Sequence, residues 1–367
     1  MRSGVIHFAF LIALLSGNTC SQAQDAAARK AAVDLNNRGL RLLESGQAQA
    51  AEPVLKDALR LSERGFGANH KNTGVIAQSV GSSLYRQSKS AEAIPYLQRS
   101  IRIAEAAGDQ VNAGQALDSL GLCQFDLKDY SAAAETFRKS LPLQMKTRGR
   151  IWDGRTRLNL GRSLVKVGKF AEAVDHLDQA YSILKDFPDA IREGQTAMAS
   201  HELAVALEEM GEHERSEEWF RTALKVRESV WGTDSFGYNV TLQNLGRVLQ
   251  RRGEFDEAAD CCRRAWQFFQ HSREAGPGDS QTLSAASTLC DALISLRRFS
   301  EAEELLTKET ADLSGKKLSD DQHIALGAAL RRKSILQLET GHPAEAAETI
   351  TESLEVLKKP PAVPMLS

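Results

Sequence analysis

Amide and guanidinium side chains one helical turn apart are the groups in this sequence best suited to binding. Asn159 precedes Arg162 by three residues, and Asn244 precedes Arg247 by the same spacing. On a helix this spacing places both side chains on one face. An amide can satisfy the backbone groups of an extended peptide, and a guanidinium can pair with a carboxylate. These pairs therefore predict recognition of a protein or peptide.

The sequence offers no comparable arrangement for catalysis. Its five cysteines include no CxxC, and its eight histidines are scattered without a paired Cys/His spacing that suits zinc. It also lacks a nucleotide-binding glycine loop, a GxSxG motif and an HExxH motif. We therefore expect a protein that is not an enzyme and that uses no metal and no cofactor.

Composition and charge argue against two further classes of protein. The chain of 367 residues has 46 basic and 48 acidic side chains, a formal net charge of −2. This balance gives no electrostatic case for binding nucleic acid. Apolar and charged residues make up 42% and 26% of the chain, which indicates neither a disordered protein nor a membrane protein.

The first 23 residues read as an export signal. Arg2 supplies the positive charge, Val5 to Leu15 is apolar apart from His7, and Ser21 to Ala23 offers a cleavage site after Ala23. The apolar run is shorter than the roughly 20 residues of a membrane-spanning helix. We expect residues 1–23 to be a signal peptide and the mature chain to be periplasmic or extracellular.

Two other interpretations of the N-terminus remain open. A lipoprotein would be anchored through Cys20, but Gly17, Asn18 and Thr19 depart from the small and apolar residues that usually precede such a cysteine. The other interpretation is a disordered or helical leader of a cytosolic protein. Sequencing the N-terminus of the mature chain separates these from export.

A repeat of 40–44 residues runs through most of the chain, and small residues mark it. One small residue anchors each repeat: Gly39, Gly81, Gly121, Gly161, Ala204, Gly246, Cys290 and Ser334. A second follows twelve positions later: Ala51, Ala93, Ala133, Ala173, Ser216, Ala258, Ala302 and Ala346. Glycine inside a helix costs roughly 0.5–1 kcal/mol relative to alanine. The glycines therefore indicate two helices whose backbones approach closely.

Three further positions complete the repeat. The residue sixteen after each anchor is apolar, as in Leu177, and the residue nineteen after is small in every repeat except one, where Glu309 stands. The residue seven after marks the turn: Gly46, Gly168, Gly211, Gly253 and Gly341, with Ser88, Lys128 and Arg297 in the other three repeats. Glycine there suits the left-handed conformation that ends many helices.

This pattern resembles the tetratricopeptide repeat. The small anchor matches, as in Asn244-Leu245-Gly246, and so does an aromatic–x–x–alanine opening of the second helix, as in Phe170–Ala173 and Phe255–Ala258. The long period and linkers such as Gly67–His70 are similar to those of kinesin light chain and of the Leu-Gly-Asn polarity proteins. The resemblance implies an all-α fold, a right-handed α-solenoid of about eight helix-turn-helix units.

The repeats account for nearly the whole chain. After the signal we expect a short leader at 24–31, either frayed or the first turn of a helix, then the solenoid at 32–358 and a disordered tail at 359–367, since Pro360 and Pro361 cannot continue a helix. We expect residues 148–154 to be a loop that carries Trp152, and Pro188 to mark a break after the fourth repeat. This arrangement leaves no room for a separate catalytic domain.

The resemblance also implies where a partner would bind. In this family the first helix of each repeat lines a concave groove. The candidate groove residues are Gln78, Tyr85, Phe125, Asn159, Arg162, His201, Gln243, Asn244, Arg247 and Gln250. The acids Asp118, Glu202 and Glu208 interrupt the basic positions that the family uses to clamp a carboxylate. The alternative is that the polar side chains only solvate a wide face and that the two aromatic ones only pack.

Two alternatives concern cysteines and assembly. Cys262 and Cys290 fall on core positions, where a free thiol acts as a small apolar group, but an exported protein could pair Cys261 or Cys262 with Cys290. The chain could also be a structural protein that self-associates, since no polar capping helix follows the last repeat. The leading expectation is a binding scaffold for a protein or peptide.

Overall fold

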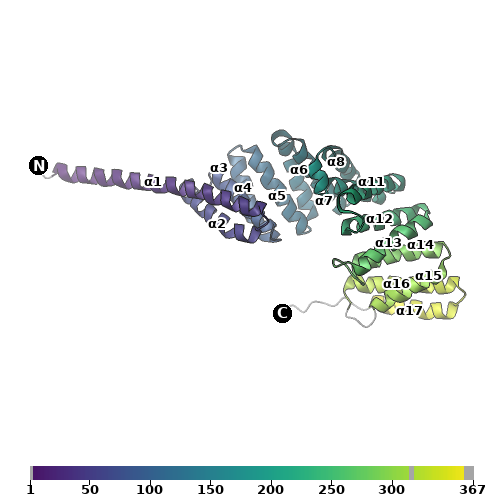
Figure 1. Cartoon of the computed structure of the whole chain (residues 1–367). Coiled ribbons are helices and arrows are strands. Elements are labelled where there is room, and N and C mark those ends of the chain that lie inside the picture. The colour runs from purple at the N-terminus through teal and green to yellow at the C-terminus, as the bar shows by residue number, and fades with distance from the viewer. Residues whose placement is uncertain (1–2, 314–317, 359–367) are drawn as a thin grey trace. The chain divides into compact units, whose positions relative to one another are not determined.

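The computed structural model describes residues 3–313 and 318–358, which form 17 α-helices and no strand (Figure 1). The chain divides into two compact units, residues 1–184 and 185–367. In both units each helix packs against the next one along the chain, which is the arrangement of an all-α solenoid of tetratricopeptide type. The fold class predicted from the sequence is confirmed.

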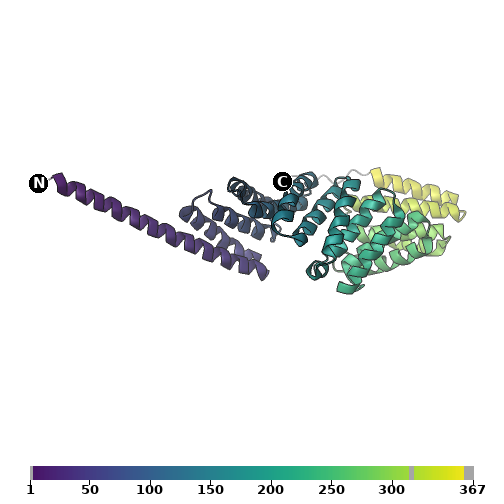
Figure 2. The same ribbon diagram turned by 90° about the horizontal axis from the view of Figure 1, so that it is seen from above.

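Unit 1 contains four helix pairs. Their bounds are α1 Ser3–Glu44, α2 Ala48–Gly65, α3 Lys71–Tyr85, α4 Ser90–Ala106, α5 Gln110–Asp126, α6 Tyr130–Thr147, α7 Arg150–Lys166 and α8 Phe170–Leu184. The N-terminal half of α1 extends beyond its partner α2 in both views (Figures 1 and 2). The first helices of successive pairs, α1, α3, α5 and α7, also contact one another.

Unit 2 contains four further pairs and one short helix. Their bounds are α9 Pro188–Arg192, α10 Gln195–Glu209, α11 His213–Trp231, α12 Phe236–Arg252, α13 Phe255–His271, α14 Ser280–Ser295, α15 Phe299–Leu313, α16 Asp320–Glu339 and α17 Pro343–Lys358. The short α9 occupies the break expected at Pro188. The pairs α10–α11 to α16–α17 bring the described helix pairs to the eight expected.

The anchor glycines lie where the two helices of a pair meet. A Cβ atom placed on Gly81, Gly121 or Gly161 would lie 2.7, 2.7 or 2.5 Å from the side chain sixteen residues later. The glycine is therefore required by the large apolar side chain of the second helix, which fills the space a methyl group would need. The alanines twelve residues after the anchors are also buried: Ala51, Ala93, Ala133, Ala173, Ala258, Ala302 and Ala346.

We expect Gly161→Ala to lower the free energy of unfolding by about 1–2 kcal/mol, because overpacking against Leu177 outweighs the better helix propensity of alanine. The same change in a Leu177→Ala background should instead stabilise the protein, since the space is then free. Urea unfolding of the four proteins measures both effects. If Gly161→Ala changed the free energy of unfolding in the same direction in both backgrounds, the result would contradict the close contact between Gly161 and Leu177.

The turn after each first helix keeps one backbone conformation whichever residue occupies it. Gly168 and Gly253 have φ values of 76° and 81°, and Ser88, Lys128 and Arg297 have values of 59°, 64° and 58°. The left-handed region costs a non-glycine residue roughly 1–2 kcal/mol. The packing of the two helices thus imposes the turn even where the sequence lacks glycine.

One expected boundary lies earlier than predicted, and one expected loop is wrong. The leader at 24–31 is helical, but it is a continuous part of α1 and packs on α2: Ala28 is buried, and Arg29 Nε donates to the Gly65 carbonyl at 2.6 Å. The expected loop at 148–154 is mostly helix, because α7 begins at Arg150. Trp152 lies in its first turn with the Arg148 guanidinium 3.5 Å from its ring centroid.

The predictions for the two chain ends are not tested by the structure, whereas the suggested disulfide is. The tail at 359–367 lies outside the described residues, and the signal peptide at 1–23 stays a prediction. Cys123, Cys261, Cys262 and Cys290 are free and buried, so the suggested pairing with Cys290 does not occur in this structure. Among the described residues, no helix is long and apolar enough to cross a membrane.

Candidate binding face and pocket

The candidate groove residues of unit 1 lie on neighbouring first helices. Gln78 on α3 donates to Gln115 on α5, with 3.4 Å between the two side-chain atoms. The Arg162 guanidinium on α7 lies 4.6 Å from the centroid of the Phe125 ring on α5. Asn159 is half-buried one turn before Arg162. The structure therefore brings Phe125 and Arg162 into contact from different repeats.

Tyr85 and Phe125, the two aromatic candidates of unit 1, make most of their contacts within the protein. Tyr85 packs against the apolar core formed by the first three helix pairs, and burial raises the pKa of its hydroxyl. The Phe125 ring meets the Tyr130 ring edge-on, with the centroids 5.0 Å apart, and its face is covered by Arg162. These contacts favour the packing interpretation for both side chains.

Asp118, expected to interrupt the groove, ties three helices together. Its carboxylate accepts hydrogen bonds from Gln144 Nε2 on α6 at 2.7 Å and from Thr156 Oγ1 on α7 at 3.0 Å. Burial raises the pKa of Asp118 to about 6. The residue is thus part of the packing between the third and fourth repeats.

In unit 2 the candidates His201 and Asn244 form a chain of polar contacts with Thr241. His201 Nδ1 lies 3.1 Å from Thr241 Oγ1, and His201 Nε2 lies 3.4 Å from Asn244 Nδ2. The Thr241 hydroxyl already donates to the Gly237 carbonyl. Therefore Nδ1 of the imidazole donates to Thr241, and Nε2 accepts from the amide of Asn244. This chain joins α10 to α12.

Arg247 is held by a buried glutamate. Its Nε and Nη2 donate to the two carboxylate oxygens of Glu208 at 2.7 and 2.6 Å, and Arg251 adds a third contact at 3.3 Å. The Glu208 side chain is completely buried. The hydrogen bonds with Glu208 raise the pKa of Arg247. Nε and Nη2 of Arg247 are therefore used within the protein and cannot form a two-hydrogen-bond pair with a carboxylate of a partner.

Gln243 leads from this group to the next repeat. It is buried, and its Nε2 donates to Ser284 Oγ on α14 at 2.6 Å. Gln250, one turn after Arg247, is half-buried. The polar side of α10, α12 and α14 is consequently a network of contacts between repeats.

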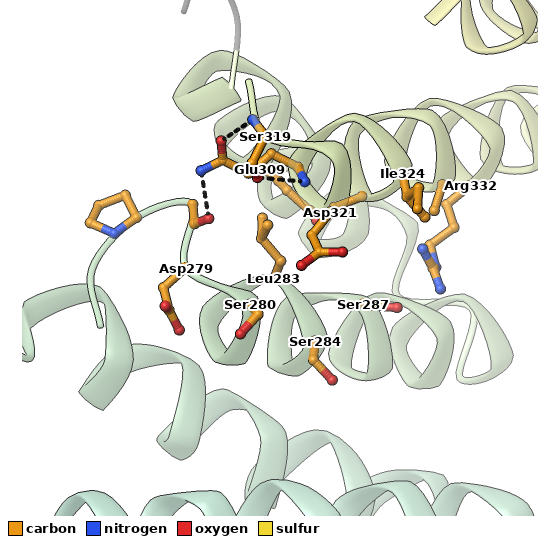
Figure 3. A pocket seen from close by; sticks show the side chains of 15 residues that line it. Asp279, Ser280, Leu283, Ser284, Ser287, Glu309, Ser319, Asp321, Ile324 and Arg332 are labelled. Carbon is orange, nitrogen blue, oxygen red and sulfur yellow. Dashed lines mark hydrogen bonds between the residues drawn. The ribbon is translucent and has the colours of Figure 1, made fainter. Parts of the chain in front are cut away.

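Beside this network a cavity of about 530 Å³ lies between α14 and α16 (Figure 3). We call it the α14–α16 pocket, and Ser284, Ser287, Glu309, Asp321, Ile324 and Arg332 are among the residues that line it. Gln322 shapes one end, because its Nε2 donates to the Gly278 carbonyl at 3.0 Å. Ser319 and Gln322 cap α16 reciprocally, which fixes the start of that helix.

The α14–α16 pocket is acidic. Glu309 is 6% exposed, its Oε2 has no hydrogen-bond partner among the described residues, and burial raises the pKa of its carboxyl to about 7. Asp321 projects from α16 towards α14 and lines the same pocket as Leu283 (Figure 3). Arg332 is already bound to both carboxylate oxygens of Asp291 at 2.7 and 3.2 Å.

The sequence-based site prediction missed Glu309. The signal was present, since Glu309 is the one charged residue at a repeat position that is otherwise small. In two other repeats this position holds Ser140 and Ser353, which donate to the carbonyls of Gly114 and Gly327 on the partner helix. A glutamate there places a carboxyl where the other repeats have only alanine or serine.

Comparison with known families agrees with this repeat geometry. Residues 30–106, 76–146, 112–186 and 195–271 match a tetratricopeptide repeat model, and residues 158–229 match a second one. These matches cover more than half of the chain. The protein belongs to the tetratricopeptide repeat family. The pairs α14–α15 and α16–α17 follow the matched residues and continue the tetratricopeptide packing.

Solved structures share the fold at low sequence identity. The apo form of RapI matches with a TM-score of 0.60 and 13% identity over 90% of this chain and 99% of that one. The apo form of the quorum sensor NprR from B. thuringiensis matches at 0.57 and 12%, over 89% and 98%. BtubC from P. vanneervenii matches at 0.51 and 17%, over 64% and 94%. A search of curated protein sequences found no match.

Proposed function

We propose that this tetratricopeptide repeat protein is a non-catalytic scaffold that binds a protein or peptide, as an adaptor or assembly factor. The observation that carries the proposal is the α14–α16 pocket, a cavity of about 530 Å³ between two first helices. Cavities of roughly 300–1,000 Å³ with a few convergent polar groups are typical of binding sites. The repeats fill the described chain, and NprR, a quorum sensor, shares their fold.

The pocket also changes which residues the proposal depends on. Arg247 and Gln243 hold neighbouring repeats together, so they position the surface more than they contact a partner. Ser287 lines the pocket from α14, at the position three before the repeat anchor. It is therefore the side chain at which a bulky substitution fills the site directly.

A selection from a display library of 12-residue peptides tests the proposed function. We expect the full chain to enrich specific peptides and Ser287→Trp to weaken their binding at least about tenfold, because the indole fills the pocket. Thr307→Trp, on the exposed side of α15, is the matched control and should bind as the wild type does. Circular dichroism verifies that both variants are folded.

Two results would overturn the proposed function. One is a selection that enriches no peptide above background. The other is a set of enriched peptides whose affinity is the same for Ser287→Trp and for the wild type.

A structural role is the second candidate, and exposed apolar side chains on the last helix pair favour it. Ile335 and Leu338 on α16 are 40% and 58% exposed, and Leu354 and Leu357 on α17 are 51% and 50% exposed. Exposed apolar side chains on the last repeat can pack against those of a second copy. Light scattering should then show an oligomer that Leu338→Glu dissociates, whereas a monomer at high concentration removes this candidate.

Export is proposed for the same chain. Among the side chains that the structure describes, Gln24 and Asp25 already lie against α2: Gln24 accepts a hydrogen bond from Arg64, and the Asp25 carbonyl lies beside Gly65. Cleavage after Ala23 would therefore keep this packing. Sequencing the mature N-terminus should find Gln24, and an intact Met1 would reject the proposal.

A further inference from the structure

The chemistry of the α14–α16 pocket points to one class of ligand group. Glu309 supplies a buried carboxyl with an oxygen that has no hydrogen-bond partner among the described residues, and Asp321 supplies a second, exposed carboxyl from α16. An acceptor that is buried without a partner costs roughly 1–3 kcal/mol. A ligand that donates hydrogen bonds and carries positive charge would remove that cost.

The cation that lines the pocket offsets only part of this negative charge. Arg332 is bound through Nε and Nη2 to Asp291, so the two form a closed ion pair. In Figure 3 the Arg332 guanidinium lies at one end of the cavity, away from Asp321. The lining therefore keeps an excess of negative charge, which disfavours an anionic ligand.

The geometry also argues against a metal ion. Among the described residues there is no group of three or more His, Cys, Asp or Glu side chains close enough to hold one. Besides its carboxyls, the pocket is lined by serine hydroxyls and by apolar side chains such as Leu283 and Ile324. Hydroxyls accept hydrogen bonds from an ammonium group, and apolar side chains pack on an alkyl stem.

We propose that the α14–α16 pocket binds a primary ammonium group of the partner, which pairs with Glu309, while Asp321 adds to the negative charge of the lining. The inference rests on the proposed function, because a bound peptide supplies the amine either as its N-terminus or as a lysine side chain. Both sources present three N–H donors. A lysine adds a four-carbon stem that matches Leu283 and Ile324.

Binding should depend on pH through Glu309. Its carboxyl faces Arg332 from α16, Asp291 from α14 and Asp312 from its own helix, and burial raises its pKa to about 7. Below this value Glu309 must lose a proton before it pairs with an ammonium group, which costs about 1.4 kcal/mol per pH unit. The affinity for an amine should therefore rise from pH 6 to pH 8.

Methyl NMR of the full chain tests the inference with small probes. Ile324, which lines the pocket, serves as the reporter. Nα-acetyl-lysine methylamide carries only the side-chain amine, glycine methylamide carries only the α-amine, and the Nε-acetylated lysine probe carries neither. We expect saturable binding of at least one free amine, and about tenfold weaker binding of the acetylated probe. The tighter of the two amines identifies the source.

Glu309→Gln is the decisive variant, since it keeps the shape of the side chain and removes the charge. It should weaken amine binding about tenfold, whereas Glu304→Gln, exposed on the same helix, should leave it unchanged. Equal binding of the acetylated probe, or full binding by Glu309→Gln, would overturn the inference. If Ser287→Trp still weakened the binding of the selected peptides, the proposed function would stand even though the inference about the ammonium group had failed.

Discussion

Replacing Arg247 by methionine is expected to lower the free energy of unfolding by about 3 kcal/mol. The substitution leaves the Glu208 carboxylate buried without the two hydrogen bonds that it receives from Arg247. An unpaired buried charge is among the costliest defects in a folded protein, since water no longer solvates it. Urea unfolding followed by circular dichroism measures the loss.

Two control variants separate this effect from a simple loss of charge. Arg251→Met removes the longer contact to the same carboxylate, at 3.3 Å, and should cost less than about 1 kcal/mol. Glu208→Met combined with Arg247→Met should regain most of the stability, because no charge is left buried. Equal losses for Arg247→Met and Arg251→Met would show that the paired geometry does not matter.

The Arg247–Glu208 pair shows which contacts the spacing of repeat positions in the sequence can predict and which it cannot. The anchor and turn positions follow from contacts within one helix pair, and the structure has them as expected at Gly161 and at Gly253. Even Lys128, which is not glycine, adopts the expected left-handed turn. Such contacts span fewer than 20 residues, so the spacing in the sequence determines them.

Contacts between repeats are harder to predict, because they depend on how one pair is rotated against the next. Arg247 and Glu208 are 39 residues apart, and Gln243 and Ser284 are 41 apart. The sequence assigned three of these side chains to a groove or its interruption. It did not reveal the hydrogen bonds that these side chains form between neighbouring repeats. The candidate residues lie on the first helices as expected, and whether they bind a partner stays a prediction; Gln243 and Arg247 make contacts between repeats.

Local chemistry explains the wrong loop at residues 148–154. Of the two glycines in this segment, only Gly149 has a positive φ, of 84°, and it precedes the first residue of α7. Gly154 is buried within α7, where a Cβ atom would lie 3.0 Å from Leu184. Two glycines of one short segment thus serve different purposes, one in a helix start and one in close packing.

Glu309→Gln is expected to change how stability depends on pH. The usual pKa of a glutamate is near 4.5, and burial raises that of Glu309 to about 7 in the folded protein. A folded pKa above the unfolded one means that the proton stabilises the folded state. This stabilisation is complete below the unfolded pKa and is lost as the pH rises through the folded pKa.

The wild type should therefore lose about 3 kcal/mol between pH 4.5 and pH 8 through this group, and Glu309→Gln should not. The measured quantity is the difference in free energy of unfolding between the two proteins, followed by urea unfolding across that range. Asp118, whose pKa is raised to about 6, titrates in both proteins and cancels in the difference.

The exposed Glu304→Gln is the control, and its difference from the wild type should stay flat over the same range. A flat difference for Glu309→Gln as well would mean that Glu309 already has a partner for its charge in the folded protein. The acidic lining of the α14–α16 pocket would then lack the unsatisfied acceptor that an ammonium ligand needs. The stability measurement thus tests, without any ligand, the property on which recognition of an amine depends.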